Sequence, residues 1–166
     1  MKAVTTVLAL ATAVQAHYSF PSIVSGGSAT TPWQYVRQWT GYYTYNPVQS
    51  VSSIDIRCNV GGSTASAPGT LPIAAGSSVS FTADPNIYHA GPALVYMAKV
   101  PAGKTAANWD GSGSVWFKVY QVGPTFGGQQ LKWPTDSMWC TLYLKFQILQ
   151  LTCVCHRCET SDIYSS

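Results

Sequence analysis

Residues 94–100 (LVYMAKV) and 115–120 (VWFKVY) decide the fold class, because each is a short apolar stretch between chain breakers. In the second stretch, apolar residues at 115, 117 and 119 alternate along the chain, which is the two-residue period of a strand. The first stretch is more continuously apolar, which is typical of a strand buried on both sides. Both stretches therefore predict β-structure.

Two further stretches show the same alternation, at Val79 and Phe81 and at Ile54, Ile56 and Cys58. Runs rich in Gly, Pro, Ser and Thr separate the predicted strands; they lie at 61–69, 101–103 and 123–128. We find no long helical period, no internal repeat and no interdomain linker. Short strands between such breakers predict an all-β sandwich in a single domain.

The first sixteen residues have the order of charge, apolar run and cleavage site found in a signal peptide. Met1-Lys2 is positive, residues 3–14 are apolar, and Val14-Gln15-Ala16 ends the segment with small residues at the two inspected positions. The apolar run is shorter than the roughly 20 residues that span a bilayer. We predict cleavage after Ala16 and secretion; the alternative is a buried N-terminal strand or helix.

Charge and composition limit the partners. The whole chain carries a formal charge of +3 and is only 9% charged. Removing Lys2 with the signal leaves eight basic and six acidic residues, a charge of +2. This charge does not favour nucleic acid or an anionic membrane as a partner. Aromatic residues make up 13% of the chain, which suits a neutral polysaccharide, although core packing is the alternative for any one ring.

His17 would become the N-terminal residue after the predicted cleavage. Its α-amine and imidazole then offer two adjacent nitrogen donors to one metal ion. His89 lies in Tyr88-His89-Ala90-Gly91-Pro92, just before the strand predicted at 94–100. A second imidazole completes three neutral nitrogen ligands, a set that suits copper. The alternative for His89 is a half-buried turn residue.

A series of motifs follows in order along the chain. They are His17, residues 55–59 (DIRCN), 89–92 (HAGP) with 95–100 (VYMAKV), 115–119 (VWFKV) and 131–135 (LKWPT). In this order they resemble the cellulose-active fungal lytic polysaccharide monooxygenases, formerly classed as glycoside hydrolases. The resemblance covers residues 17–138, which we assign as the catalytic domain between a signal peptide at 1–16 and an atypical tail at 139–166.

The resemblance implies an immunoglobulin- or fibronectin-like β-sandwich and one copper ion per chain, held by His17 and His89. It also implies oxidative cleavage of cellulose or a related β-glucan, by hydrogen abstraction at a glycosidic carbon. The reaction would use O2 or hydrogen peroxide and an external electron donor. We expect a secreted monomer. Tyr42, Tyr43 and Tyr45 lie where the family keeps substrate contacts; packing is the alternative for each.

The tail departs from the family. After Met138 we find no counterpart of its outer-sphere His, its Gln or the Tyr axial to copper, so we expect the sandwich to be incomplete at this end. The resemblance implies a disulfide at Cys58, but its partner is not evident. The alternative function is a secreted sandwich that binds copper or polysaccharide with weak or no catalysis. Cys153, Cys155, His156 and Cys158 are an alternative zinc site, although secretion favours disulfides.

Overall fold

The computed structural model describes residues 18–65, 67–87, 90–128, 130–133, 135, 141–145 and 155–158. In these residues the structure consists of short strands and two short 3₁₀ helices, with loops between them. The elements are β1 (Ser19–Ser25), β2 (Ser28–Ala29), η1 (Tyr42–Thr44), η2 (Ile54–Arg57), β3 (Ser78–Asp84), β4 (Ala93–Ala98), β5 (Trp116–Val122), β6 (Thr125–Gly127), β7 (Gln130–Lys132), β8 (Thr141–Lys145) and β9 (Cys155–Cys158). The predicted all-β class is confirmed.

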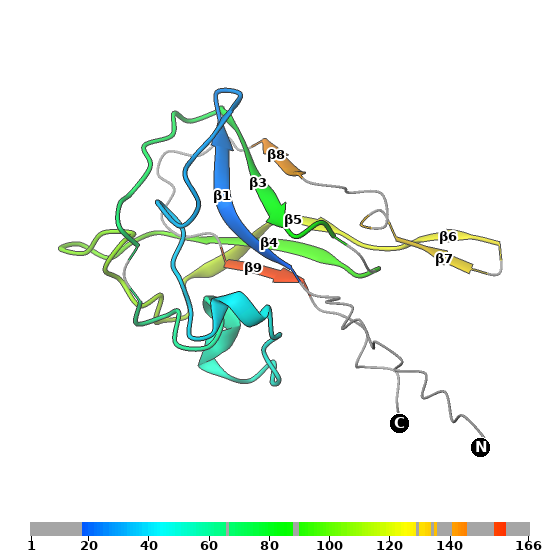
Figure 1. Ribbon diagram of the computed structural model, residues 1–166, viewed down its shortest axis with the longest axis horizontal. Helices are drawn as coiled ribbons and strands as arrows, with labels where there is room; N and C mark the ends of the chain where they lie inside the picture. Colours follow the sequence, from blue (N-terminus) through cyan, green and yellow to red (C-terminus); the bar gives the residue numbers. More distant parts are fainter. Residues whose placement is uncertain are drawn as a thin grey trace, which may run out of the picture.

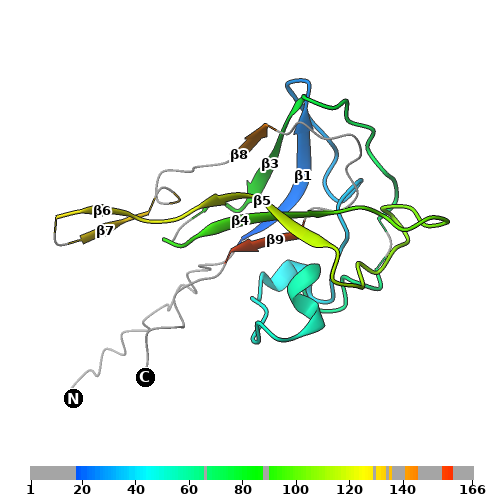
Figure 2. The same ribbon diagram turned by 180° about the vertical axis from the view of Figure 1, so that it is seen from behind.

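Two sheets form the body of the molecule. One sheet has the strand order β2-β1-β3-β8 and the other has the order β5-β4-β9. Figure 1 shows β1 and β3 of the first sheet running across β4, β5 and β9 of the second. The β6-β7 hairpin extends away from the body beyond β5, and the view from behind in Figure 2 shows the same arrangement. Within the described part of the chain, no helix has the length and apolarity needed to cross a bilayer.

The core lies between the two sheets. It is built from Phe20 of β1, Val79 and Phe81 of β3, and Val95 and Met97 of β4. Burying side chains of this size stabilises a fold by about 1.5–3 kcal/mol each. The strands predicted from alternation near 79–82 and 115–120, and from the apolar stretch at 94–100, are confirmed as β3, β5 and β4.

The strand predicted at residues 54–58 is wrong, because Ile54–Arg57 form the 3₁₀ helix η2. The Ser53 hydroxyl accepts a hydrogen bond from the Asp55 amide at 3.2 Å and donates one to the Asp55 carboxylate at 3.0 Å. The other carboxylate oxygen accepts from the Gly61 amide at 3.1 Å. Such local bonds offer the backbone an alternative to a sheet ladder. Ile54 is 55% exposed, so the apolar alternation does not mark a buried face here.

The tail supplies one strand to each sheet. β8 pairs antiparallel with β3, and β9 pairs antiparallel with β4. The sequence pattern at 142–148 fits a strand or a helix, and the structure has a strand at Thr141–Lys145. Among the described strands β5 is at the edge of its sheet, and Phe117, which pairs with the buried Met97, is 53% exposed.

Candidate metal centre

The start of β1, which follows His17 in the sequence, lies beside the end of β3, which precedes His89. Ser19 pairs with Asp84 across this ladder, and its hydroxyl donates a hydrogen bond to the Asp84 carbonyl at 3.2 Å. The predicted ligands His17 and His89 lie outside the described residues. In the sequence, His17 stands two residues before Ser19, and His89 stands five residues after Asp84. The described flanks of the two histidines are therefore joined to each other by hydrogen bonds.

The chain on the other side of His89 is clamped by Thr135. The Thr135 hydroxyl accepts a hydrogen bond from the Gly91 amide at 3.1 Å and donates one to the Gly91 carbonyl at 2.8 Å. Thr135 is 1% exposed, so water does not compete for these bonds. Ile87 and Ala93 are also buried, which fixes the chain on both sides of residues 88–92. The sequence motif at 131–135 gave Thr135 no role, because its partner lies 44 residues away.

Tyr45 reaches the same strand end. Its backbone adopts a left-handed conformation with φ of 56°, and its hydroxyl donates a hydrogen bond to the Asp84 side chain. Burial of the phenol raises the pKa of Tyr45, and the negative charge and hydrogen bond of Asp84 raise this pKa further. Both effects favour the protonated phenol. Tyr45 therefore ties the loop after η1 to the end of β3.

Tyr42 and Tyr43 belong to a chain of aromatic contacts that we call the aromatic row, formed by Trp39, Trp33, Tyr42 and Tyr43. Ring centroids are 5.4 Å apart between Trp39 and Trp33, 5.1 Å between Trp33 and Tyr42, and 5.6 Å between Tyr42 and Tyr43. All three contacts are edge-to-face, the geometry that aromatic pairs prefer. The row ends at Tyr43, whose side chain is 70% exposed and available to a partner outside the chain.

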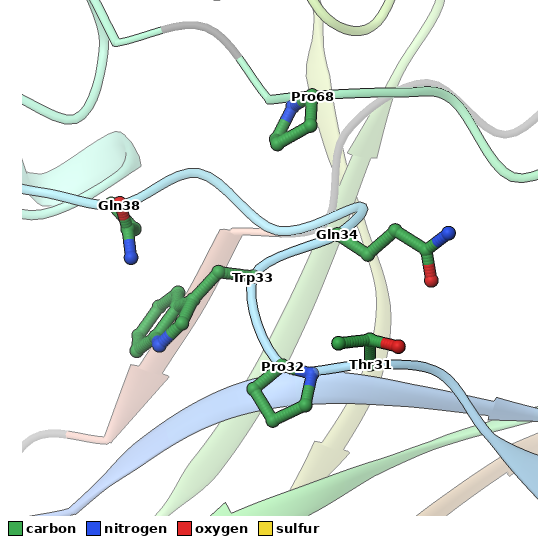
Figure 3. Close-up of a pocket in the computed structure, with 6 residues that line it drawn as sticks. All are labelled: Thr31, Pro32, Trp33, Gln34, Gln38 and Pro68. Carbon is green, nitrogen blue, oxygen red and sulfur yellow. The ribbon is translucent and has the colours of Figure 1, made fainter.

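A pocket of about 420 Å³ lies beside the row, and its lining residues are Thr31, Pro32, Trp33, Gln34, Gln38 and Pro68. Figure 3 shows the Trp33 indole beside Gln38, whereas the Gln34 amide points to the opposite side. An indole with nearby amides can stack on a sugar face and bond its hydroxyl groups. Trp33 was not singled out from the sequence, because single aromatic residues are more often packed in a core.

No group of three or more His, Cys, Asp or Glu residues gathers within the part of the chain that the structure describes. The alternative zinc site in the tail falls partly on β9. Successive strand positions face opposite sides of a sheet, so positions 155 and 156 belong to different sides. This alternation does not favour one ion shared by neighbouring residues of β9. Cys153, the remaining donor of that site, lies outside the described residues.

Comparison with known proteins gives one family. The model of Auxiliary Activity family 9 (formerly GH61) matches residues 17–150. The chain is 51% identical over 133 residues to AA9 family lytic polysaccharide monooxygenase H of Malbranchea cinnamomea, covering 79% of this chain and 56% of that protein. It is 50% identical over 133 residues to AA9 family lytic polysaccharide monooxygenase C of Emericella nidulans, covering 80% and 57%.

Solved structures agree with the fold. The crystal structure of a cellulose-active polysaccharide monooxygenase from M. thermophila matches with a TM-score of 0.60 and 26% identity, covering 78% of this chain and 62% of that one. The structure of HiLPMO9B matches with a TM-score of 0.57 at 23% identity and supports the fold alone. The present chain spans a little over half the length of the curated relatives it matches.

Proposed function

Because this chain belongs to Auxiliary Activity family 9, we propose that it is a copper-dependent monooxygenase that cleaves glycosidic bonds oxidatively in cellulose or a related β-glucan. The family match over residues 17–150 carries this proposal. The name of the solved relative from M. thermophila, a cellulose-active enzyme, supports cellulose as the substrate.

The ligands in this proposal are His17 and His89, with one copper ion per chain. Removal of residues 1–16 on export frees the α-amine of His17, which joins its own imidazole and that of His89 as a nitrogen donor. Three neutral nitrogen donors fit copper better than the oxygen-preferring divalent ions. The hydrogen bond between Ser19 and Asp84 and the clamp of Thr135 on Gly91 support the pairing, since both act on segments that flank the histidines.

Bound copper would supply the redox chemistry that removes a hydrogen from a glycosidic carbon, with O2 or hydrogen peroxide as oxidant and an external electron donor. The residues of this chain would hold the metal ligands in position and bind the substrate. Thr135 holds the backbone next to His89, and the bond between Tyr45 and Asp84 holds the loop after η1. The exposed ring of Tyr43, backed by Tyr42, is suited to stacking on a sugar face at the substrate surface.

The test of the copper site compares three forms of the chain: one starting at His17, one with a single Gly before His17, and one carrying His89→Ala. Copper affinity is measured by calorimetry, and the coordination is read from the electron paramagnetic resonance spectrum. We expect tight binding and a nitrogen-ligand spectrum only for the first form. His156→Ala is the control, since it removes the remaining histidine and should leave affinity unchanged. Equal affinity with the extra Gly would refute the role of the α-amine.

Activity needs a separate measurement, because the Tyr that the family places beside the metal has no recognisable counterpart after Met138 in this sequence. The copper-loaded chain is incubated with cellulose, ascorbate and O2, and soluble oxidised oligosaccharides are identified by mass spectrometry. Oxidised products support the monooxygenase. Copper binding without oxidised products would support the second candidate, a secreted sandwich that binds copper or polysaccharide without turnover.

A further inference from the structure

The pocket beside the aromatic row is uncharged and has the size of a small-ligand site. Its volume of about 420 Å³ lies within the roughly 300–1,000 Å³ of pockets that hold small molecules. None of the lining residues that the structure describes carries a charge, so an ionic ligand would find no partner of opposite charge among them. We call it the Trp33 pocket, after the aromatic residue in its lining.

A tight turn places the Trp33 indole in this pocket. The Gln34 amide donates a hydrogen bond to the Thr31 carbonyl at 3.2 Å, which closes the turn. Pro32 and Trp33 are its two central residues, and Trp33 has a φ of 64°, a value that normally belongs to glycine at the second central position. The Trp33 amide donates to the Pro21 carbonyl of β1 at 2.8 Å, which holds the turn in place. A bulky residue in this conformation is strained, and such strain is concentrated at ligand sites.

The polar side chains of the pocket are available to a ligand. Among the residues that the structure describes, the side-chain amides of Gln34 and Gln38 and the Thr31 hydroxyl have no hydrogen-bond partner, and all three residues are exposed. An amide offers two N–H donors and one carbonyl acceptor, and a hydroxyl both donates and accepts. In Figure 3 the Gln38 amide lies near the indole and the Gln34 amide points the other way, so the two amides serve different sides of the turn.

From this lining we propose that the Trp33 pocket binds one end of a soluble β-glucan chain, as a subsite separate from the exposed ring of Tyr43. A β-linked glucose ring has apolar C–H faces and a rim of equatorial hydroxyl groups. The indole stacks on such a face, and the amides of Gln34 and Gln38 bond to the hydroxyl groups. A pocket suits a free chain end, whereas a crystalline face needs a flat surface. The choice of a β-glucan rests on the proposed function.

A nuclear magnetic resonance titration tests this subsite. The chain is produced by secretion, freed of metal with a chelator, and titrated with cellotetraose. The indole N–H signal of Trp33 is assigned by its loss in Trp33→Phe. We expect this signal to shift and to saturate, because the indole contacts a sugar ring. Gln38→Ala should raise the dissociation constant by about 2–10-fold, since one side-chain hydrogen-bonding group is lost. Gln130→Ala is the matched control, because Gln130 is equally exposed but lies on β7, outside the pocket.

Three results would overturn the subsite. They are a Trp33 signal that does not move up to the solubility limit of the sugar, equal dissociation constants in Gln38→Ala and Gln130→Ala, and loss of the shift in Tyr43→Ala. A shift that persists in Tyr43→Ala supports a separate subsite. The titration needs neither copper nor turnover. A chain that binds cellotetraose here without forming oxidised products would contradict the proposed function alone, and oxidised products without the shift would contradict this subsite alone.

Discussion

Thr135 holds the backbone next to a proposed copper ligand with a single hydroxyl that both accepts and donates. We predict that Thr135→Val destabilises the fold by about 1–3 kcal/mol, because the Gly91 amide and carbonyl would lose their partner at a buried position. The midpoint of urea unfolding measures this loss, and copper affinity should fall with it. Thr135→Ser keeps the hydroxyl and is the matched control. An unchanged midpoint in Thr135→Val would show that the clamp contributes nothing.

Tyr45 should make the free energy of unfolding depend on pH in the alkaline range. Burial and Asp84 raise the pKa of the folded phenol above its unfolded value of about 10. The folded state therefore holds this proton more tightly, so the contribution is complete below pH 10 and is lost as pH rises through the folded pKa. We predict that unfolding free energy falls more steeply between pH 9 and 11 in the native chain than in Tyr45→Phe. Parallel curves for the two proteins would rule out this linkage.

At the scale of elements, the turn that follows η2 depends on a glycine. A Cβ atom at Gly62 would overlap the Cys58 carbonyl oxygen, and the Gly62 amide donates to the Asn59 carbonyl at 2.9 Å. We predict that Gly62→Ala destabilises the protein by about 1–3 kcal/mol, because the backbone must shift to relieve the overlap. Gly123→Ala is the control, since nothing lies within 4 Å of a Cβ atom there. Thermal unfolding of both variants measures the difference, and equal melting temperatures would contradict it.

The elements also differ in how far the sequence predicts them. β3, β4 and β5 were predictable as strands, because each is a short alternating or continuously apolar stretch. Their burial was less predictable, since Ser80 is buried and Phe117 is 53% exposed. η2 was not, since capping by Ser53 and Asp55 overrides an apolar alternation. β1 gives no clean alternation because its register shifts between Ser19 and Ser22.

The candidate site, too, could be predicted from the sequence only in part. His17 and His89 were predictable candidates from a cleavage site and a turn motif, and as ligands they stay predictions. The contacts of Thr135 with Gly91 and of Tyr45 with Asp84 join residues distant in the sequence. No local pattern encodes such pairs, so they became visible only in the fold.

At the scale of the whole molecule, the disulfide that the resemblance implies at Cys58 would close a loop of 82 to 100 residues, because the other four cysteines lie between Cys140 and Cys158. Closing a loop of this length restricts the unfolded chain, and disulfides of this kind stabilise small secreted domains by about 2–5 kcal/mol. That is a large part of the roughly 5–15 kcal/mol that holds a typical domain together.

We therefore predict that Cys58→Ser lowers the free energy of unfolding by about 2–5 kcal/mol. A thiol reductant should lower the melting temperature of the native chain to that of Cys58→Ser and leave the variant unchanged. A native chain insensitive to reductant would show that no such bond supports the fold.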